Sequence, residues 1–460
     1  MSQKRRYANT GLRVLVVLLS VILLVLLIIA ASQRSRQMTQ EHMATAPETT
    51  VETTTAPTTE PEPTEPPVEK IATATILNTG DLLYHERVIN SGLDPETKTY
   101  NYDSIFNYIA PYVQAADYAV ANLEGTLAGN TNGYKYSGYP CFNTPDASVD
   151  AAKKAGFDML LTANNHTYDT KTTGFHRTQQ VLVEKEMDYI GTRQSTEDKT
   201  YVVKEINGIK VGMVCYTYQS GTNSNGTKKL NGISMNAQDS KLITSFDYDH
   251  LDKFYKQLEG ELAAMKDEGA DITVIYIHWG REYKTTPNSW QLKIGQALCN
   301  LGVDIIVGGH AHVVQPVTVL QNEIDPQKNT LCLYSMGNAV SNIRYSDTRP
   351  AETEDGMLFT FTLAKYTDGS VVIEGADILS TWVNRHDSEQ YGREIFPIVP
   401  LDPEIDDWTV FGLDSKTLSQ AEKSLKRSEA VLAEGLESVN QFYSQKQTEH
   451  EQTIGVTKNP

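Results

Sequence analysis

The chain has 460 residues, 40% of them hydrophobic and 21% charged, which is enough for one large domain or two ordinary ones. Its 58 acidic and 40 basic residues give a formal net charge of −18. Because no basic run follows the N-terminal segment, this balance excludes a general nucleic-acid binder. We therefore expect no nucleic-acid partner.

Residues 14–31 form an apolar stretch that only Ser20 interrupts. As a helix, this stretch spans about 27 Å at ~1.5 Å per residue, close to the hydrocarbon core of a bilayer. Basic residues precede it, so the positive-inside rule predicts a cytoplasmic segment at 1–13 and a single-pass membrane anchor with the rest of the chain outside. A cleaved signal peptide ending near Ala31 is the alternative, although such signals are usually shorter.

Residues 32–70 are dominated by Thr, Pro, Glu and Ala, as in "ATAPETTVETTTAPTTEPEPTEPP". Such a composition cannot bury a core, and we expect a disordered, extended linker of up to ~120 Å at ~3.1 Å per residue. A tether of this length suits a domain held within or beyond a cell wall. We therefore expect the cell membrane of a Gram-positive bacterium, with the C-terminal domain extracellular.

From residue 71 to about 400, short apolar runs alternate with helical patterns, which predicts an α/β domain with mostly parallel strands. Asn207-Gly208 and Asp368-Gly369 are hairpin turn signals, so we expect antiparallel strands that extend the domain into two mixed sheets. Residues 401–460 read as a helical, polar C-terminal tail. The predicted helices are 103–116, 146–155, 174–186, 248–268, 287–301 and 415–445. The four cysteines form no C-x-x-C pair, and Cys215 and Cys332 are interpreted as buried free thiols.

Five strand-like runs end in side chains that bind metals or transfer protons. These side chains are Asp81, Glu124, Asn165 with His166, His278, and His310 with His312. Because the carboxyl ends of parallel strands converge on one crevice, we expect these residues to meet. Oxygen donors mixed with imidazoles favour Mn, Fe or Zn over Ca or Mg.

Two further residues near these strand ends are candidates. His85 lies four residues after Asp81, and Glu282 lies four residues after His278. Each of them is a candidate either to bind the metal directly or to fix the orientation of a metal ligand through a hydrogen bond. Glu282 is equally well interpreted as a surface carboxylate. Arg281 and Arg87 are candidates for holding an anion.

The segments "TGDLLYH", "ANLEGTL", "LLTANNHTYD", "IHWGREY", "VGGHAHVVQPV" and "YSMGNAVSN" follow one another between residues 72 and 342. In this order they resemble the CapA family, named for poly-γ-glutamate capsule synthesis and related to the calcineurin-like metallophosphoesterases. The resemblance implies a four-layer α/β/β/α sandwich with a metal centre at the ends of its two sheets.

The resemblance also implies roles for the strand-end residues. Asp81 matches the first aspartate ligand, and Glu124 matches the carboxylate that bridges two metals. Asn165 matches an asparagine ligand and His166 the catalytic histidine beside it, while His278, His310 and His312 match the histidine ligands. Leu83 stands where the superfamily has a histidine, so the ligand set of the first metal is incomplete unless His85 substitutes. Occupancy by one ion and occupancy by two ions therefore both stay open.

The resemblance implies a membrane-anchored protein for synthesis, export or anchoring of a capsule polymer such as poly-γ-glutamate. Its partners would be a cell-envelope polymer or phosphoester and membrane-bound polymer synthase subunits. Whether the metal site turns over as a phosphoesterase stays open. The alternative is a non-catalytic subunit that binds polymer or assembles with partners on the same fold.

Overall fold

The structure, a computed structural model, describes residues 68–345 and 349–453. The predicted cytoplasmic segment, the predicted membrane anchor and nearly all of the predicted linker lie outside these ranges. Within the described ranges, none of the helices is both long enough and apolar enough to span a bilayer.

The first sheet has eight strands in the order β20-β17-β16-β1-β2-β3-β4, with β15 paired to β1. Strands β1 to β4 are parallel, whereas β16, β17 and β20 add an antiparallel half. The turn from β16 to β17 holds the predicted Asp368-Gly369 pair, with Gly369 at a φ of 85°. The strands are β1 (Lys70–Leu82), β2 (Tyr118–Leu123), β3 (Met159–Leu161), β4 (Asp188–Ile190), β15 (Asn338–Val340), β16 (Asp355–Tyr366), β17 (Val371–Val383) and β20 (Ile398–Pro400).

The second sheet has seven strands in the order β10-β6-β11-β12-β14-β13, with β5 paired to β6. The predicted Asn207-Gly208 turn joins β5 to β6, and both residues have the positive φ that a two-residue hairpin turn needs. The strands are β5 (Tyr201–Ile206), β6 (Ile209–Tyr218), β10 (Ser245–Phe246), β11 (Ile272–His278), β12 (Ile305–Gly309), β13 (Val317–Gln321) and β14 (Asn329–Leu333).

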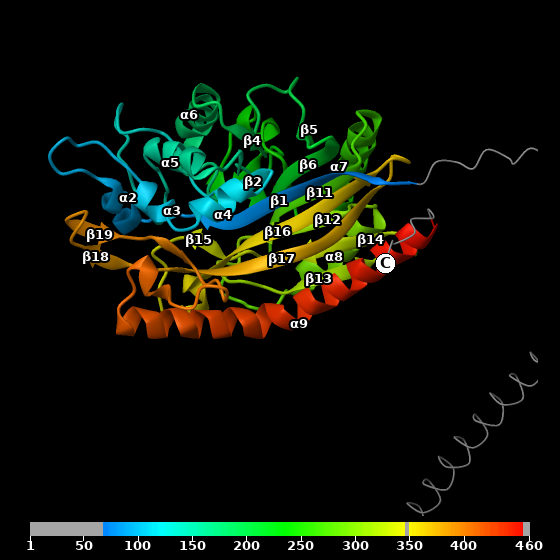
Figure 1. Cartoon of the computed structure of the whole chain (residues 1–460). Helices are drawn as coiled ribbons and strands as arrows, with labels where there is room; N and C mark the ends of the chain where they lie inside the picture. Colours follow the sequence, from blue (N-terminus) through cyan, green and yellow to red (C-terminus); the bar gives the residue numbers. More distant parts are fainter. Residues whose placement is uncertain (1–67, 346–348, 454–460) are drawn as a thin grey trace, which may run out of the picture. The chain divides into compact units, whose positions relative to one another are not determined.

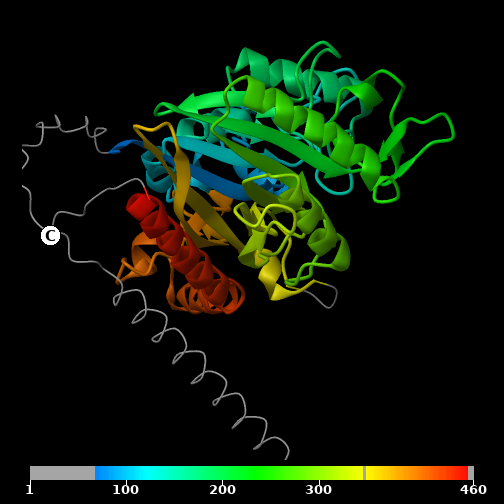
Figure 2. The same cartoon turned by 90° about the vertical axis from the view of Figure 1, so that its right-hand side faces the viewer.

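The two sheets pack face to face, and helices cover their outer faces (Figures 1 and 2). Alternate residues of a buried strand enter different cores: Val274 of β11 lies between the sheets, whereas Ile275 faces the helices. The Tyr276 hydroxyl donates a 2.9 Å hydrogen bond to the Asn78 side chain across the interface. The predicted mixed α/β fold with two sheets is confirmed.

Helices α2 to α6 cover the first sheet, and α7 and α8 cover the second. The predicted helix 103–116 is wrong as one element, because it divides into α3 and α4. Pro111 lacks a backbone N–H and restricts the residue before it, so it fits only the first turn of a new helix. The helices are α2 (Glu86–Gly92), α3 (Asp103–Phe106), α4 (Ala110–Ala115), α5 (Ala147–Ala155), α6 (Lys171–Glu184), α7 (Leu251–Asp267), α8 (Ser289–Asn300) and α9 (Ser415–Thr453).

Helix α9, in the predicted tail, lies along β17 of the first sheet and β13 of the second (Figure 1). Its apolar face enters the core between the sheets through Leu432, Val439 and Tyr443. Arg427 forms a two-pronged ion pair at 2.5 and 2.8 Å with the buried Asp355 at the start of β16. The helix therefore belongs to the same compact unit as the sheets.

Shorter elements complete the described structure. Strands β7, β8 and β9 form a small meander between β6 and β10, and β18 pairs with β19. All four cysteines are free, and Cys215 and Cys332 are buried, as predicted. The remaining elements are β7 (Gly221–Thr222), β8 (Lys228–Leu230), β9 (Ile233–Ser234), β18 (His386–Ser388), β19 (Arg393–Ile395), η1 (Asp239–Lys241), η2 (Ala351–Glu354) and η3 (Trp408–Phe411).

Candidate metal centre

The carboxyl ends of five parallel strands from both sheets meet at one point. Asp81 lies near the end of β1, Glu124 directly follows β2, and His278 is the last residue of β11. The other predicted residues stand in the loops after β3 and β12. Glycines let these strand ends come close: a Cβ at Gly80 would lie 1.9 Å from the Gly337 carbonyl oxygen, and one at Gly308 would lie 2.1 Å from that of Tyr334.

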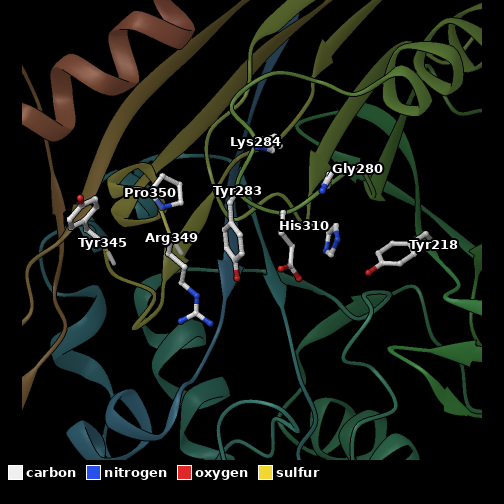
Figure 3. Close-up of a pocket in the computed structure, with 10 residues that line it drawn as sticks. Tyr218, Gly280, Tyr283, Lys284, His310, Tyr345, Arg349 and Pro350 are labelled. Carbon is white, nitrogen blue, oxygen red and sulfur yellow. The ribbon is translucent and has the colours of Figure 1, made fainter. Parts of the chain in front are cut away.

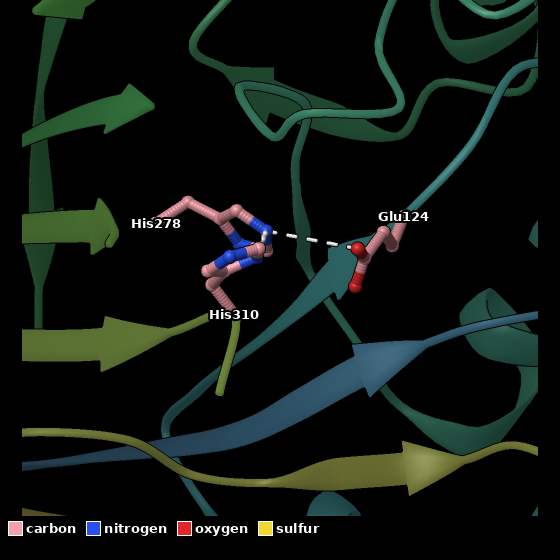
Figure 4. Close-up of side chains that lie close together, drawn as sticks. All are labelled: Glu124, His278 and His310. Atoms are coloured by element: carbon pink, nitrogen blue, oxygen red, sulfur yellow. Dashed lines mark hydrogen bonds and ion pairs between the residues drawn. The ribbon is translucent and has the colours of Figure 1, made fainter. Parts of the chain in front are cut away.

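His278 and His310 face Glu124 on one side of the centre (Figure 4), and Asn165 from the β3 loop lies beside His278. His278 Nε2 lies 2.8 Å from Asn165 Oδ1, 3.2 Å from His310 Nδ1 and 3.6 Å from Glu124 Oε1. Because His278 Nε2 and His310 Nδ1 face each other, at most one of these two nitrogens carries a proton. Burial and the neighbouring charges of His278 and His312 hold the pKa of His310 well below its usual value.

Asp81 and His312 face Glu124 on the other side. His312 Nδ1 lies 3.2 Å from Asp81 Oδ2, and His312 Nε2 lies 3.9 Å from Glu124 Oε1. Burial lowers the pKa of His312, but the charge of Glu124 and the contact with Asp81 outweigh it and raise the pKa to about 9. Burial opposes ionisation of Asp81, yet its histidine neighbours hold its pKa below the ordinary value.

The carboxylates of this cluster are unusually poor in hydrogen bonds. Glu124 is fully buried, and within the described ranges no donor bonds to either of its oxygens. Asp81 Oδ2 also accepts no hydrogen bond of good geometry. Because burying an ionised carboxylate costs several kcal/mol unless charges and hydrogen bonds compensate it, and the imidazole nitrogens beside Glu124 Oε1 stand off at 3.6 to 4.0 Å, this arrangement fits a positive ion that these oxygens would share. Mixed oxygen and imidazole donors suit Mn, Fe or Zn.

His166 stands at the edge of the cluster with one ring nitrogen already engaged. Its Nδ1 lies 2.7 Å from Asp169 Oδ2, while its Nε2 lies 4.0 Å from Glu124 Oε1. Burial lowers the pKa of His166, but the hydrogen bond and charge of Asp169 outweigh it and raise the pKa. The Phe142 ring packs edge-on against the imidazole at 4.7 Å between centroids. A proton on Nε2 therefore faces the centre.

Sequence reasoning missed the residues that hold these side chains in place. Asp169 was readable from its position three residues after His166. Asn122, two residues before Glu124 and so on the same strand face, donates a 2.8 Å hydrogen bond to Asp81 Oδ1. Asn338, whose Oδ1 lies 3.0 Å from His312 Nδ1, comes from β15 and lies in the segment "YSMGNAVSN", in which no residue was given a role from the sequence.

The further candidates differ in where they lie. Glu282 is exposed but reaches His310 and His312, with which it forms a possible cation-binding group. The Nδ1 of His85 accepts a hydrogen bond from the Asn342 N–H at 3.3 Å, and no possible cation-binding group of the described residues includes it. Burial lowers the pKa of His85 to about 4. Leu83 packs with Phe142 in an apolar cluster at the wall of the centre.

Three bulky residues of the centre have left-handed backbones. The φ angles are 88° at His310, 55° at His312 and 63° at Tyr283. Such conformations cost about 1–3 kcal/mol each in residues other than glycine and gather at functional sites. The Tyr283 N–H donates a 2.8 Å hydrogen bond to the Ala311 carbonyl, which ties the two strained loops together.

A cavity of about 970 Å³ opens beside the centre (Figure 3). Arg281, one of the two predicted anion-holding arginines, lines it. Arg87 does not, because it forms a 2.7 Å ion pair with Glu394. The lining residues are Tyr218, Gly280, Arg281, Glu282, Tyr283, Lys284, His310, Tyr345, Arg349 and Pro350.

Comparison with known proteins agrees with this fold class. Residues 75–343 match the family model described as "Bacterial capsule synthesis protein PGA_cap". Because the match covers more than half of the chain, the chain belongs to this bacterial capsule synthesis family. The predicted family is confirmed.

Two curated relatives bear names from the same biology. The chain is 30% identical over 254 residues to "Capsule biosynthesis protein CapA" of Bacillus anthracis, covering 54% of this chain and 56% of that protein. It is 28% identical over 279 residues to "PGA biosynthesis protein CapA" of Bacillus subtilis (strain 168), covering 60% and 65%. The matched region therefore spans less than two thirds of either relative.

Solved structures give a weaker likeness. The NAD nucleotidase NadN of Haemophilus influenzae aligns over 83% of this chain and 68% of its own, with 11% identity and a TM-score of 0.40. The sulfate thiohydrolase SoxB of Thermus thermophilus aligns over 78% and 60%, with 12% identity and a TM-score of 0.37. At these TM-scores the likeness carries no conclusion about activity.

Proposed function

We propose that this protein is a metal-dependent phosphoesterase that acts in the synthesis, export or anchoring of a bacterial capsule polymer. Membership of the capsule synthesis family supports the biological role. The convergence of Asp81, Glu124, Asn165, His278, His310 and His312 supports a centre for one or two divalent ions. The two sheets between helical layers agree with a four-layer metallophosphoesterase-like sandwich.

One observation carries the proposal: within the described ranges Glu124 is a fully buried carboxylate with no hydrogen bond to either oxygen. A purely structural carboxylate at this depth would be hydrogen-bonded. Glu124 instead has imidazole nitrogens at 3.6 to 4.0 Å, and it is common to two possible cation-binding groups, one with His278 and His310 and the other with Asp81 and His312.

The chain's own residues supply the proton chemistry. A divalent cation, when bound, supplies a Lewis acid for a phosphoryl oxygen. In the proposed hydrolysis, water attacks phosphorus while the ester P–O bond breaks, and His166 would donate its Nε2 proton to the departing ester oxygen, because Asp169 engages Nδ1 and fixes the ring orientation. Asn122 and Asn338 hold the ligands Asp81 and His312 at their angles.

We further propose that the apolar residues 14–31 anchor the protein in the cell membrane with this domain outside. The apolar length and the preceding basic residues support this topology. Partners would be the cell-envelope polymer or phosphoester and membrane-bound synthase subunits of the same capsule system.

The test measures metal content and hydrolysis of bis-p-nitrophenyl phosphate by the purified full chain, with and without Mn²⁺. His166→Ala should retain the metal and lose roughly 10²- to 10⁴-fold in kcat, the usual contribution of a general acid. His450→Ala, on α9 far from the centre, is the matched control and should change neither. Bound metal without turnover would instead favour the non-catalytic assembly subunit, and absence of both would refute the centre.

A further inference from the structure

The cavity beside the centre has a sign of charge opposite to that of the chain. The chain carries 58 acidic and 40 basic residues, yet three cations line the cavity against one carboxylate, Glu282. Within the described ranges Arg281, Lys284 and Arg349 have no carboxylate within ion-pair distance. A cleft lined by one sign of charge concentrates ligands of the other.

The three cations are not equivalent. Arg281 and Lys284 are exposed, and long exposed side chains of this kind are commonly solvated. Arg349 is partly buried, and its guanidinium and the Glu282 carboxylate both hydrogen-bond with the Tyr283 hydroxyl. Arg349 is therefore tied to the cavity wall through Tyr283.

Tyr283 links Arg349 to the metal centre. Its ring stacks obliquely near His312, with 6.1 Å between centroids. Its backbone has a φ of 63°, and that conformation costs stability in a bulky residue. The strained backbone aims the phenol into the cavity, where Figure 3 draws it between Arg349 and His310.

This order of residues separates two positions for negative charge. A phosphoryl group at the centre would lie against His310 and His312. Figure 3 draws Tyr283 between Arg349 and His310, so Arg349 is placed for a different group of the same ligand. The guanidinium fork is a donor suited to phosphate or carboxylate oxygens, and the phenol O–H, which Glu282 also engages, is a further donor beside it.

We propose that Arg349 and the Tyr283 hydroxyl form a second anion subsite beside the metal centre, which selects phosphoesters that carry a second anionic group. That group is a further phosphate or a carboxylate. The assignment rests on the proposed phosphoesterase function for the identity of the first group, and Arg281 and Lys284 add to the attractive field.

Calorimetric titration of the full chain, with equal Mn²⁺ in cell and syringe, tests the subsite without turnover. The probes are propylphosphonate, which has one anionic group, and methylenediphosphonate and 3-phosphonopropionate, which have two. The wild type should bind at least one two-group probe about tenfold or more tightly than propylphosphonate, since charge-assisted hydrogen bonds are the strong ones. The probe that gains identifies the second group as phosphate or carboxylate.

The variants separate the subsite from general charge. Arg349→Gln should weaken the two-group probe by about 10- to 100-fold and propylphosphonate by less than about twofold. Arg349→Lys keeps the charge but lacks the guanidinium fork, so its affinity for the two-group probe should lie between those of the wild type and Arg349→Gln. Lys328→Gln makes the same change of charge at an exposed site near the start of β14, outside this cavity, and should change neither.

Equal affinity of the wild type for all three probes would overturn the subsite, and so would equal losses for all probes in Arg349→Gln. Hydrolysis of bis-p-nitrophenyl phosphate, measured in parallel, distinguishes failure of the subsite from failure of the phosphoesterase. An Arg349-dependent preference without hydrolysis upholds the subsite and refutes the phosphoesterase. Hydrolysis without any preference among the three probes would uphold the phosphoesterase and refute the subsite.

Discussion

The two halves of the candidate centre share Glu124 but differ in how completely they surround a cation. On one half, His278 Nε2 lies within 3.6 Å of donor atoms from three other residues: Asn165, His310 and Glu124. On the other half, Asp81 and His312 are the inner donors. The first half has the fuller set.

The difference has a local cause at Leu83. Leu83, two residues after Asp81, packs into an apolar cluster with Phe142 and Ile343 and offers no ligand atom to this half. His85 does not supply one, since its Nδ1 already accepts the Asn342 N–H. We expect the Glu124–Asn165–His278–His310 half to bind an ion tightly and the Asp81 half to bind one weakly.

Removing the shared ligand should have the largest effect. Glu124→Gln keeps the shape of the side chain and removes the charge that faces both halves. We expect loss of both ions and a fall in kcat/KM of roughly 10³-fold or more, since a metal's electrostatic role is worth several kcal/mol. Metal analysis after gel filtration and steady-state kinetics measure this. A variant that keeps two ions and its turnover would remove Glu124 from the centre.

Single substitutions on the two halves of the centre should have different effects on metal binding. His310→Ala should lower the affinity for the tight ion by about 100-fold or more, because changes even behind the ligands cost about 10- to 100-fold. Asp81→Asn should leave the tight ion in place and remove the weak one. Calorimetric titration of metal-free protein with Mn²⁺ distinguishes them. Equal losses in both variants would contradict two unequal halves.

Adding a histidine to the Asp81 half should have a smaller effect in the opposite direction. Leu83→His would place an imidazole near the Asp81 half and raise the affinity for the weak ion by about tenfold, one ligand's share on the scale of such substitutions. Leu83→Asn is the control for polarity alone and should not raise it. If both variants bind the weak ion alike, Leu83 is not the reason for the asymmetry.

Much of this fold was predictable from local signals. The strand runs that end at Asp81, Glu124, His278 and His310 are largely buried on both faces, and their apolar residues predicted the strands. The hairpin at Asn207-Gly208 follows from turn chemistry alone. The break between α3 and α4 was not predicted from local signals, because the residue pattern over 103–116 is typical of one continuous helix despite Pro111.

The supporting residues were harder to predict because they act across long sequence separations. Asn338 reaches His312 from another strand, and Arg349 reaches Tyr283 from a distant loop. Neither contact leaves a periodicity or spacing in the chain. Helix α9 was predicted as a helix in a polar C-terminal tail, but its place along β17 and β13 depends on both sheets having formed.

The most direct measurement of the central claim is anomalous diffraction at the manganese edge from crystals of the full chain soaked in Mn²⁺. The account predicts a strong peak bounded by Glu124, Asn165, His278 and His310, with a weaker one beside Asp81 and His312. Crystals that show no peak at Glu124 under saturating Mn²⁺, or peaks only elsewhere, would contradict it.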